Sequence, residues 1–339
     1  MNPSKLDPVR RDSICLQCHL EGESAIARFG RSLTSYRPGD NLFDHVAYFV
    51  HKGDSGQAER ATSQWEALLQ SKCKQKSGDR LTCTTCHDPH SSVAPEQRIS
   101  FYRSKCIACH NDATFIAQHH PENPDCASCH MPRQTTADIA HEQVTDHRIQ
   151  RVGNPVLKTS NPLPNKLATV GDLPATVREY GLAYAQIAQY GDAFATEQAL
   201  RCLKEAESSD ATQASDAELH TQIGFLAQKT GDRKLAEEEY KAALKADPLK
   251  STAAGNLAVM LAQNGDLAGA VALWQSAFDH DPEQLAAGYD LAVVECALGN
   301  PAVANQTLSR LLLFSPDNEN ARKLHTAIGN GTLACEKHQ

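Results

Sequence analysis

The sequence predicts a mainly α-helical chain made of two unlike halves, and two repeated patterns are the basis of this prediction. In the first 150 residues, which are polar and rich in loops, the pattern Cys-x-x-Cys-His occurs four times. In the second half, small residues, a large residue and a proline return every 34 residues. We therefore expect a largely irregular first half with short helices, organised by what its motifs bind, and an α-solenoid in the second half.

The Cys-x-x-Cys-His pattern is the attachment site of c-type haem. The two sulfurs form thioethers with the porphyrin vinyl groups, and the histidine that follows at once ligates iron from the proximal side. Two residues between the thiols match the separation of the vinyl groups. The sequence thus predicts four covalently bound haems, attached through Cys15, Cys18, Cys83, Cys86, Cys106, Cys109, Cys126 and Cys129 and ligated by His19, His87, His110 and His130.

Zinc binding or disulfide formation is the competing interpretation of these cysteines. Zinc would need paired Cys-x-x-Cys units or a distant histidine pair to complete four ligands, and this does not explain a histidine after every second cysteine. The aromatic content of only 6% fits a first half whose core is porphyrin. Charge is nearly balanced in this half, with 17 Lys and Arg against 18 Asp and Glu, so a nucleic-acid partner is not expected.

Seven further histidines lie in the first half, more than the four sixth positions that four haems would leave vacant. A second histidine closes an iron to substrate, whereas an open haem could bind nitrite, hydroxylamine or peroxide. His90 is too close to His87 to reach round the same ring and should serve a neighbouring haem. His141 and His147 are six residues apart on an expected helix and should face different haems. The candidate distal ligands are His51, His90, His119 or His120, His141 and His147, with His45 the last of the seven.

Bis-histidine ligation is expected to dominate, because Met131 follows His130 directly and cannot swing to the opposite face of that haem. The second, third and fourth motifs are separated by 23 and 20 residues, which brings their haems into contact range. Closely packed haems favour electron hopping, which a single substrate site would not need.

The remaining segments of the first half follow local signals. Residues 1–14 are expected to be a polar arm and residues 20–40 irregular chain, in which Arg28, Arg31 and Arg37 are either solvated or paired with haem propionates. The 3.6-residue spacing of apolar positions predicts helices over 41–51 and 60–71. Four prolines between residues 150 and 175 predict a semi-stiff linker that ends the haem module at residue 149.

Several stretches also resemble a known family. ICLQCHLEG, YRPGD, SKCKQKSGDRLTCTTCHDPH, CHMPR and DIAHEQVTDHRIQR are similar to multihaem c-type cytochromes fused to tetratricopeptide repeats, over nearly the whole chain. The resemblance implies covalent haem and a repeat domain. Family members begin with a signal peptide and further haem motifs, so it also implies that this sequence is the C-terminal part of a longer protein or has a mis-assigned start.

The 34-residue period sets the register of the second half. Units that start at Ala217, Ser251 and Leu285 place Gly, Ala, a large residue, a small or apolar residue and Pro at constant positions. An unrelated helical bundle would not keep this spacing. The predicted solenoid spans 176–330, with a degenerate unit from Val177, a capping helix over 319–328 and a tail over 331–339.

Four cysteines lie outside the haem motifs. Cys202 and Cys296 fall inside repeat helices, where they are expected to be small core residues too far apart to pair. Cys335 lies in the polar tail. For Cys73 a disulfide, a free thiol and packing against haem all remain open.

These features predict an electron carrier rather than an enzyme, with repeats that dock redox partners or other copies of the chain. The alternatives are a multihaem oxidoreductase with one open haem, and a subunit of a conductive extracellular cytochrome filament. No stretch has the length of a membrane span. Covalent haem attachment takes place outside the cytoplasmic membrane, so we expect a periplasmic or extracellular protein whose signal peptide is absent from this numbering.

Overall fold

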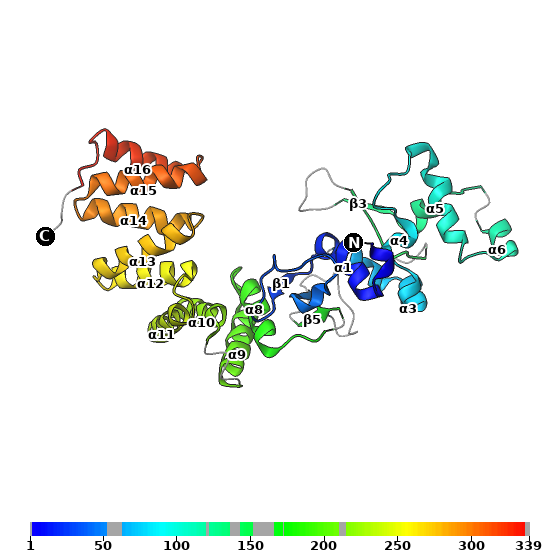
Figure 1. Ribbon diagram of the computed structural model, residues 1–339, viewed down its shortest axis with the longest axis horizontal. Helices are drawn as coiled ribbons and strands as arrows, with labels where there is room; N and C mark the ends of the chain where they lie inside the picture. Colours follow the sequence, from blue (N-terminus) through cyan, green and yellow to red (C-terminus); the bar gives the residue numbers. More distant parts are fainter. Residues whose placement is uncertain are drawn as a thin grey trace. The chain divides into compact units, whose positions relative to one another are not determined.

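The structure, a computed structural model, describes residues 2–52, 63–119, 122–135, 143–151, 166–171, 173–209 and 215–335 of the 339-residue chain. The chain divides into two compact units, Met1–Glu179 and Tyr180–Gln339, whose elements are labelled in Figure 1. Within the described ranges, no helix is long and apolar enough to cross a membrane.

A three-stranded antiparallel sheet in the order β1-β2-β5 carries the protein core of the first unit. Its strands are β1 Ser24–Ala27, β2 Val46–His51 and β5 Leu167–Val170. Tyr48 of β2 lies opposite Ala25 of β1 and Val170 of β5. Apolar side chains cluster around this sheet; they are Leu16, Leu20, Tyr36, Leu42, Phe43, Val46, Tyr48, Val50 and Val170.

The helix predicted over residues 41–51 is wrong. A 3₁₀ turn, η2 (Leu42–Asp44), is followed by strand β2, whose residues 46–50 are all buried. A continuous run of β-branched and aromatic residues packs well as a central strand, and its periodicity alone cannot distinguish strand from helix. The helix predicted over 60–71 is confirmed in its described part, where α2 spans Gln64–Gln70. β1 also corrects the expectation of irregular chain over 20–40.

The N-terminal segment is not an arm. After η1 (Pro3–Lys5), helix α1 spans Pro8–His19 and buries Leu16 in the sheet core. The Asp7 carboxylate accepts a hydrogen bond from Arg10 N at 3.0 Å, and Pro8 occupies the first helical position. An acidic N-cap followed by proline is a helix start signal, so this helix could have been predicted from the sequence.

Short elements make up the rest of the first unit: α3 Lys72–Ser77, η3 Gly78–Arg80, α4 Cys83–Cys86, η4 Pro95–Gln97, α5 Arg98–Ile107, α6 Ala113–Gln118, α7 Cys126–His130, β3 Arg133–Thr135 and β4 Gln143–Thr145. Strands β3 and β4 pair antiparallel, with Arg133 opposite Thr145. The helix expected around His141 and His147 is therefore wrong over its described part, which is a strand followed by a turn.

The end of the predicted linker belongs to the first unit. Residues 167–170 pair with β2, whereas residues 152–165 and 172 of that segment lie outside the described structure. Beyond them, Arg28 donates to the Pro174 carbonyl at 3.1 Å and to Glu179 at 2.8 Å. A short β-prone run after the prolines was enough to complete the sheet.

The second unit is a stack of antiparallel helix pairs (Figure 1). Its helices, the first of which begins in the first unit, are α8 Val177–Ala188, α9 Ala193–Ser209, α10 Ala217–Thr230, α11 Arg233–Ala246, α12 Ser251–Gln263, α13 Leu267–His280, α14 Leu285–Ala297, α15 Pro301–Phe314 and α16 Glu319–Gly329. The helices α10, α12 and α14 begin at the residues where the 34-residue register places the repeats. Helix α16 begins where the capping helix was expected.

The repeated residues have distinct structural roles. Ala236, Ala270 and Ala304 are each fully buried. The repeated glycines end the first helix of each pair with φ near 90°, as Gly265 does with φ 87°. Gly265 does not lie where two helices touch, because no atom would lie within 4 Å of a Cβ there. Helix contact requires glycine instead at Gly224, where a Cβ would lie 2.8 Å from the Tyr240 ring.

Candidate functional site

The four Cys-x-x-Cys-His motifs each lie in or at the end of a helical turn. They occupy the C-terminal end of α1, α4, the end of α5 and α7. Positions i and i+3 of a helix lie on one face, so the two sulfurs of a motif lie together. Caps fix two of the turns: Asp125 accepts from Ser128 N at 3.2 Å, and Thr82 and Thr85 form a reciprocal capping box.

The arrangement of these residues does not suit zinc, and their cysteines are not joined by disulfides. None of the eight motif cysteines is in a disulfide. In the described part of the chain, no three ligand atoms from the motifs lie within 4.8 Å of one another. A structural zinc ion needs four ligands at about 2.0–2.3 Å. Cys18, Cys109 and Cys129 are exposed, which leaves room for a large group beside the first, third and fourth motifs.

Thiols of different motifs lie next to each other. Cys15 and Cys83 share a hydrogen bond, which lowers the pKa of Cys15 to about 7 and raises that of Cys83. Burial, and then the nearby Cys126, raise the pKa of Cys106 to about 11. The first motif is thus beside the second and the third beside the fourth. Spacing had predicted proximity only for the last three motifs, because Cys15 is distant in sequence.

Two motif histidines each have a second histidine beside them. The ring centroids of His87 and His147 are 6.2 Å apart, and those of His130 and His119 are 5.9 Å apart. Two imidazoles that bind one metal from opposite sides, each through a nitrogen at about 2 Å, have centroids roughly 6 Å apart. Both pairs join a predicted proximal histidine to a predicted distal candidate, and both centroid separations are close to this distance.

Hydrogen bonds at Nδ1 orient three histidine rings of the first unit, two of which belong to these pairs. His130 Nδ1 is 2.6 Å from the Gln150 carbonyl oxygen, and His147 Nδ1 is 2.8 Å from the Thr145 carbonyl oxygen. His19 Nδ1 is 3.2 Å from Gln64 Oε1. An Nδ1–H donated to oxygen fixes the ring and makes Nε2 the nitrogen that can bind metal, which is the usual outer-sphere support of metal-bound histidine.

The other predicted distal ligands are placed less specifically. His90 is exposed, and its backbone N–H donates to Asp88 at 2.9 Å. His51 is half-buried at the end of β2. His120 and His141 lie outside the described residues. His45 is buried, with Nδ1 2.9 Å from Ser35 Oγ and Nε2 3.5 Å from Asp40, so both of its nitrogens have protein partners.

Helices α4 to α7, which carry the last three motifs, have no apolar core of their own among the described residues. Among the described residues, the buried hydrophobic side chains stop at Leu68 and resume at Leu167. Helices α4, α5, α6 and α7 bury no residue, and Ile99 and Phe115 are 46% and 40% exposed. Helices of 4 to 10 residues are not stable alone. The last three motifs therefore lie on short helices whose apolar side chains are left partly exposed.

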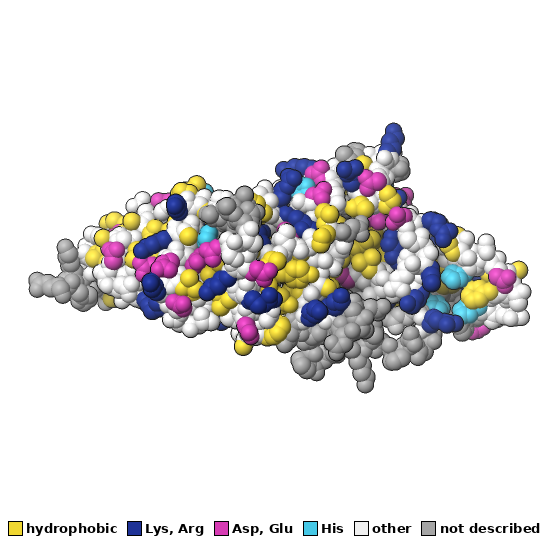
Figure 2. Space-filling view, turned by 90° about the horizontal axis from the view of Figure 1, so that it is seen from below, with side chains coloured by type: hydrophobic (Ala, Val, Ile, Leu, Met, Phe, Trp, Pro, Cys, Tyr) yellow, Lys and Arg dark blue, Asp and Glu magenta, His cyan; other side chains and the backbone are white. Residues whose placement is uncertain are grey.

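The arginines of residues 20–40 were expected to be solvated or paired with haem propionates. Arg28 is instead bonded to protein groups. Its guanidinium donates to the Phe43 carbonyl at 2.7 Å and to the buried Glu179 carboxylate at 2.8 Å. Arg37 donates to the carbonyls of Thr34 and Tyr36 at 2.8 Å. Figure 2 shows histidine side chains gathered beside Lys and Arg over the region of α5 and α6.

A separate polar cluster lies inside the repeats. His220 of α10 has its Nδ1 2.7 Å from Glu239 of α11 and 3.7 Å from Glu207 of α9. The hydrogen bond to Glu239 raises the pKa of His220, although burial opposes it. This is the one group in the described ranges that brings three possible metal-ligand side chains together. One imidazolium between two carboxylates already accounts for its buried charge as an ion pair.

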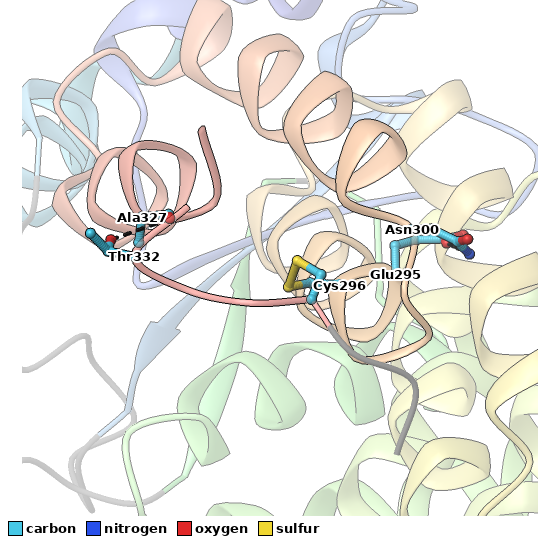
Figure 3. Close-up of a disulfide and its surroundings, with 6 residues drawn as sticks. Glu295, Cys296, Asn300, Ala327 and Thr332 are labelled. Carbon is cyan, nitrogen blue, oxygen red and sulfur yellow. Dashed lines mark hydrogen bonds between the residues drawn. A yellow bond between two sulfur atoms is a disulfide. The ribbon is translucent and has the colours of Figure 1, made fainter. Parts of the chain in front are cut away.

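The C-terminal tail is joined to the last repeat by a disulfide between Cys296 and Cys335 (Figure 3). The prediction that Cys296 is only a small core residue is therefore incomplete. Near the disulfide, Asn300 donates to Glu295 at 2.7 Å, and the Thr332 hydroxyl donates to the Ala327 carbonyl at 3.3 Å. The first contact joins the end of α14 to the start of α15, and the second holds the start of the tail against α16. Cys202 is buried and Cys73 half-buried, and both are free thiols.

The helices of the second unit define an α-solenoid of antiparallel pairs, and sequence comparison identifies the repeat. Two sequence models of the tetratricopeptide repeat match residues 222–284 and 261–328. The C-terminal part of the chain thus contains tetratricopeptide repeats, as predicted, and such repeats serve protein–protein interaction. No curated protein matches the chain.

Solved structures with similar folds include a tetratricopeptide repeat protein from Parabacteroides merdae, at 21% identity and a TM-score of 0.40. That match covers 46% of this chain, which spans only 60% of the Parabacteroides protein. MamA of AMB-1 is 20% identical over 46% of this chain and 80% of MamA, with a TM-score of 0.38. The first repeat domain of Spaghetti (RPAP3), bound to an HSP90 peptide, is 21% identical over 34% of this chain and 94% of that domain, with a TM-score of 0.31.

Proposed function

We propose that residues 1–151 bind four c-type haems and transfer electrons through them, while the tetratricopeptide repeats dock a redox partner. The observation that carries this proposal is the absence of an apolar core among the described residues of 83–135, which bear the last three motifs, combined with the paired histidines. Folded helices that bury nothing against protein need a partner inside the same region. The Cys-x-x-Cys-His motifs specify which partner can be attached there.

Bound haem would supply reversible one-electron chemistry at iron. The chain's own residues would fix its position through the eight motif cysteines and hold the iron between histidine rings. Bis-histidine ligation excludes substrate and water from the iron, which suits transfer rather than catalysis. The neighbouring sulfurs of Cys15 and Cys83, and of Cys106 and Cys126, support close spacing of the attached groups in two pairs.

An exported location is part of the proposal. Covalent haem attachment takes place outside the cytoplasmic membrane, and the Cys296–Cys335 disulfide is a kind of bond that persists in oxidising compartments. Cytosolic reductants would keep such a pair as thiols. A periplasmic or extracellular protein accommodates both features without further assumptions.

The test is to express the chain with an export signal and the c-type maturation machinery, and to count haems by intact mass and pyridine haemochrome assay. Four covalent haems per chain are expected, and three or fewer would overturn the proposal. A matched control replaces Cys106 and Cys109 with Ala, which should remove one haem and leave three. If both proteins carry no haem, the motif interpretation is wrong.

Ferric spectroscopy of the same protein separates a carrier from an enzyme. All four haems should be low-spin if each iron has two histidines. A high-spin signal from one haem in the unaltered protein would favour the multihaem oxidoreductase instead.

A further inference from the structure

One short segment connects two of the candidate haem sites. Residues 145–150 begin at the last residue of strand β4; one end of this segment is bonded to the chain just after the fourth motif and the other to the motif itself. The Asp146 N–H donates to the Pro132 carbonyl at 3.0 Å. At the other end, the Gln150 N–H donates to the His130 carbonyl at 2.9 Å, and the Gln150 carbonyl oxygen lies 2.6 Å from His130 Nδ1.

The middle of the segment faces a different motif. The His147 ring lies 6.2 Å, centroid to centroid, from the ring of His87 in the second motif. The bond between His147 Nδ1 and the Thr145 carbonyl, at 2.8 Å, fixes the direction of this ring. His147 therefore reaches one site while its chain neighbour Gln150 contacts the histidine of another.

Asp146 holds this segment in shape. Its side chain is 2% exposed and accepts from Arg148 N at 2.9 Å, Arg148 Nη2 at 2.7 Å and Gln150 Nε2 at 2.8 Å. Ile149 between them has a φ of 48°, in the left-handed region that β-branched residues avoid. A strained backbone persists only when its surroundings fix it, and the Asp146 contacts do so here.

We propose that the 145–150 segment serves two haems at once. His147 is the sixth ligand of the haem attached at Cys83 and Cys86, and the Gln150 carbonyl orients His130, the fifth ligand of the haem attached at Cys126 and Cys129. Asp146 is the positioning residue for both contacts. This assignment rests on the proposed function, and it makes the ligation of the two haems depend on one another.

The first experiment replaces His147 with Ala in the loaded, full-length chain. Four haems should remain, because thioether attachment requires only the motifs, and one quarter of the ferric haem should change from low-spin to high-spin. His147→Met should restore a low-spin haem with a raised reduction potential, since Met/His ligation raises the potential. Four haems with an unchanged low-spin spectrum in His147→Ala would overturn the assignment of His147. Fewer than four haems in the unaltered chain would overturn the proposed function instead.

The haem served by His147 can be identified in a background that lacks the second haem. After Cys83→Ala and Cys86→Ala, the His147→Ala change should add no further high-spin signal. A new high-spin signal in this background would show that His147 serves another haem.

Asp146→Asn tests the connection between the two sites. It should retain four haems, give a partial high-spin signal, and raise the potential of one further haem that stays low-spin. The rise is expected because a weaker Nδ1 hydrogen bond makes His130 a poorer donor to ferric iron. Asp247→Asn in the repeats is the matched control and should change neither signal. If Asp146→Asn alters spin state without moving any second potential, the shared role of the segment is wrong.

Discussion

The motif-bearing helices α4 to α7 and the repeat helices α10 to α15 are both helical, but only the repeats are stabilised by their own side chains. Each repeat pair buries alanines and a large residue to near-zero exposure, as Ala270 and Trp274 show at 0% and 3%. The helices of the motif region bury no residue. Helical content therefore says little about how a region is stabilised, and the source of apolar surface distinguishes the two.

The largest expected effect comes from withholding haem. Expressed without the maturation machinery, the chain should lose amide-exchange protection throughout residues 83–135, while the repeats keep theirs. The described residues of 83–135 bury no apolar core, whereas the repeat helices bury apolar side chains of their own. Hydrogen exchange followed by mass spectrometry measures both regions in one sample. Native-like protection of 83–135 without haem would contradict the comparison.

Removal of the Cys296–Cys335 disulfide should have the next largest effect, and only in the repeats. Closure of a loop between cysteines 39 residues apart is expected to stabilise the folded chain by about 2–4 kcal/mol. Cys335→Ser should therefore lower the denaturant midpoint of the repeats, and a reductant should have no further effect on this variant. An unchanged midpoint would mean that the tail contributes nothing to the last repeat.

Overpacking of a repeat should cost less. Ala270→Leu places a larger side chain at a fully buried contact and should destabilise the repeats by ~1–3 kcal/mol. Ala268→Leu makes the same change at an exposed position of α13 and should be within about 0.5 kcal/mol of the parent. Denaturant unfolding followed by Trp274 fluorescence, in a Trp65→Phe background, measures both. Loss of attached haem in Ala270→Leu would show that the two regions fold as one.

The smallest effect is a pH dependence within the repeats. The hydrogen bond to Glu239 raises the pKa of His220 above its ordinary value of 6.5, and Glu207 and Asp216 act in the same direction. The resulting stabilisation is complete below that ordinary value and is lost as the pH rises through the raised pKa. The unfolding midpoint should thus fall with rising pH, and His220→Gln should remove this slope. His325→Gln in α16 is the control and should retain it.

The sequence predicted the repeats well because each position of the 34-residue unit has one structural role. A left-handed turn requires glycine at Gly265, and a buried contact requires a small residue at Ala270, so spacing alone placed the helices. The Cys296–Cys335 disulfide was missed because it depends on where the chain turns after α16, and no local pattern specifies that turn.

The candidate site was predictable in its motifs and less so in its connections. The Cys-x-x-Cys-His spacing is local, but the neighbours of each motif are set by the tertiary fold. His147 was predicted as a distal ligand on a helix, whereas it follows a strand, and its position beside His87 could not be deduced from spacing. The helix predicted over 41–51 failed for a related reason, because burial on a sheet overrode its periodicity.

The adjacent thiols of different motifs have a consequence for biogenesis. Cys15 lies beside Cys83, and Cys106 lies beside Cys126. An oxidising compartment would convert such neighbours into cross-links between motifs, and a cross-linked sulfur can no longer react with a vinyl group. If haem is attached to this chain as proposed, attachment has to outpace thiol oxidation, or a dedicated reductant has to keep these four sulfurs reduced until it occurs. The hydrogen bond from Cys83 lowers the pKa of Cys15 to about 7, which increases the share of reactive thiolate at Cys15 near neutral pH.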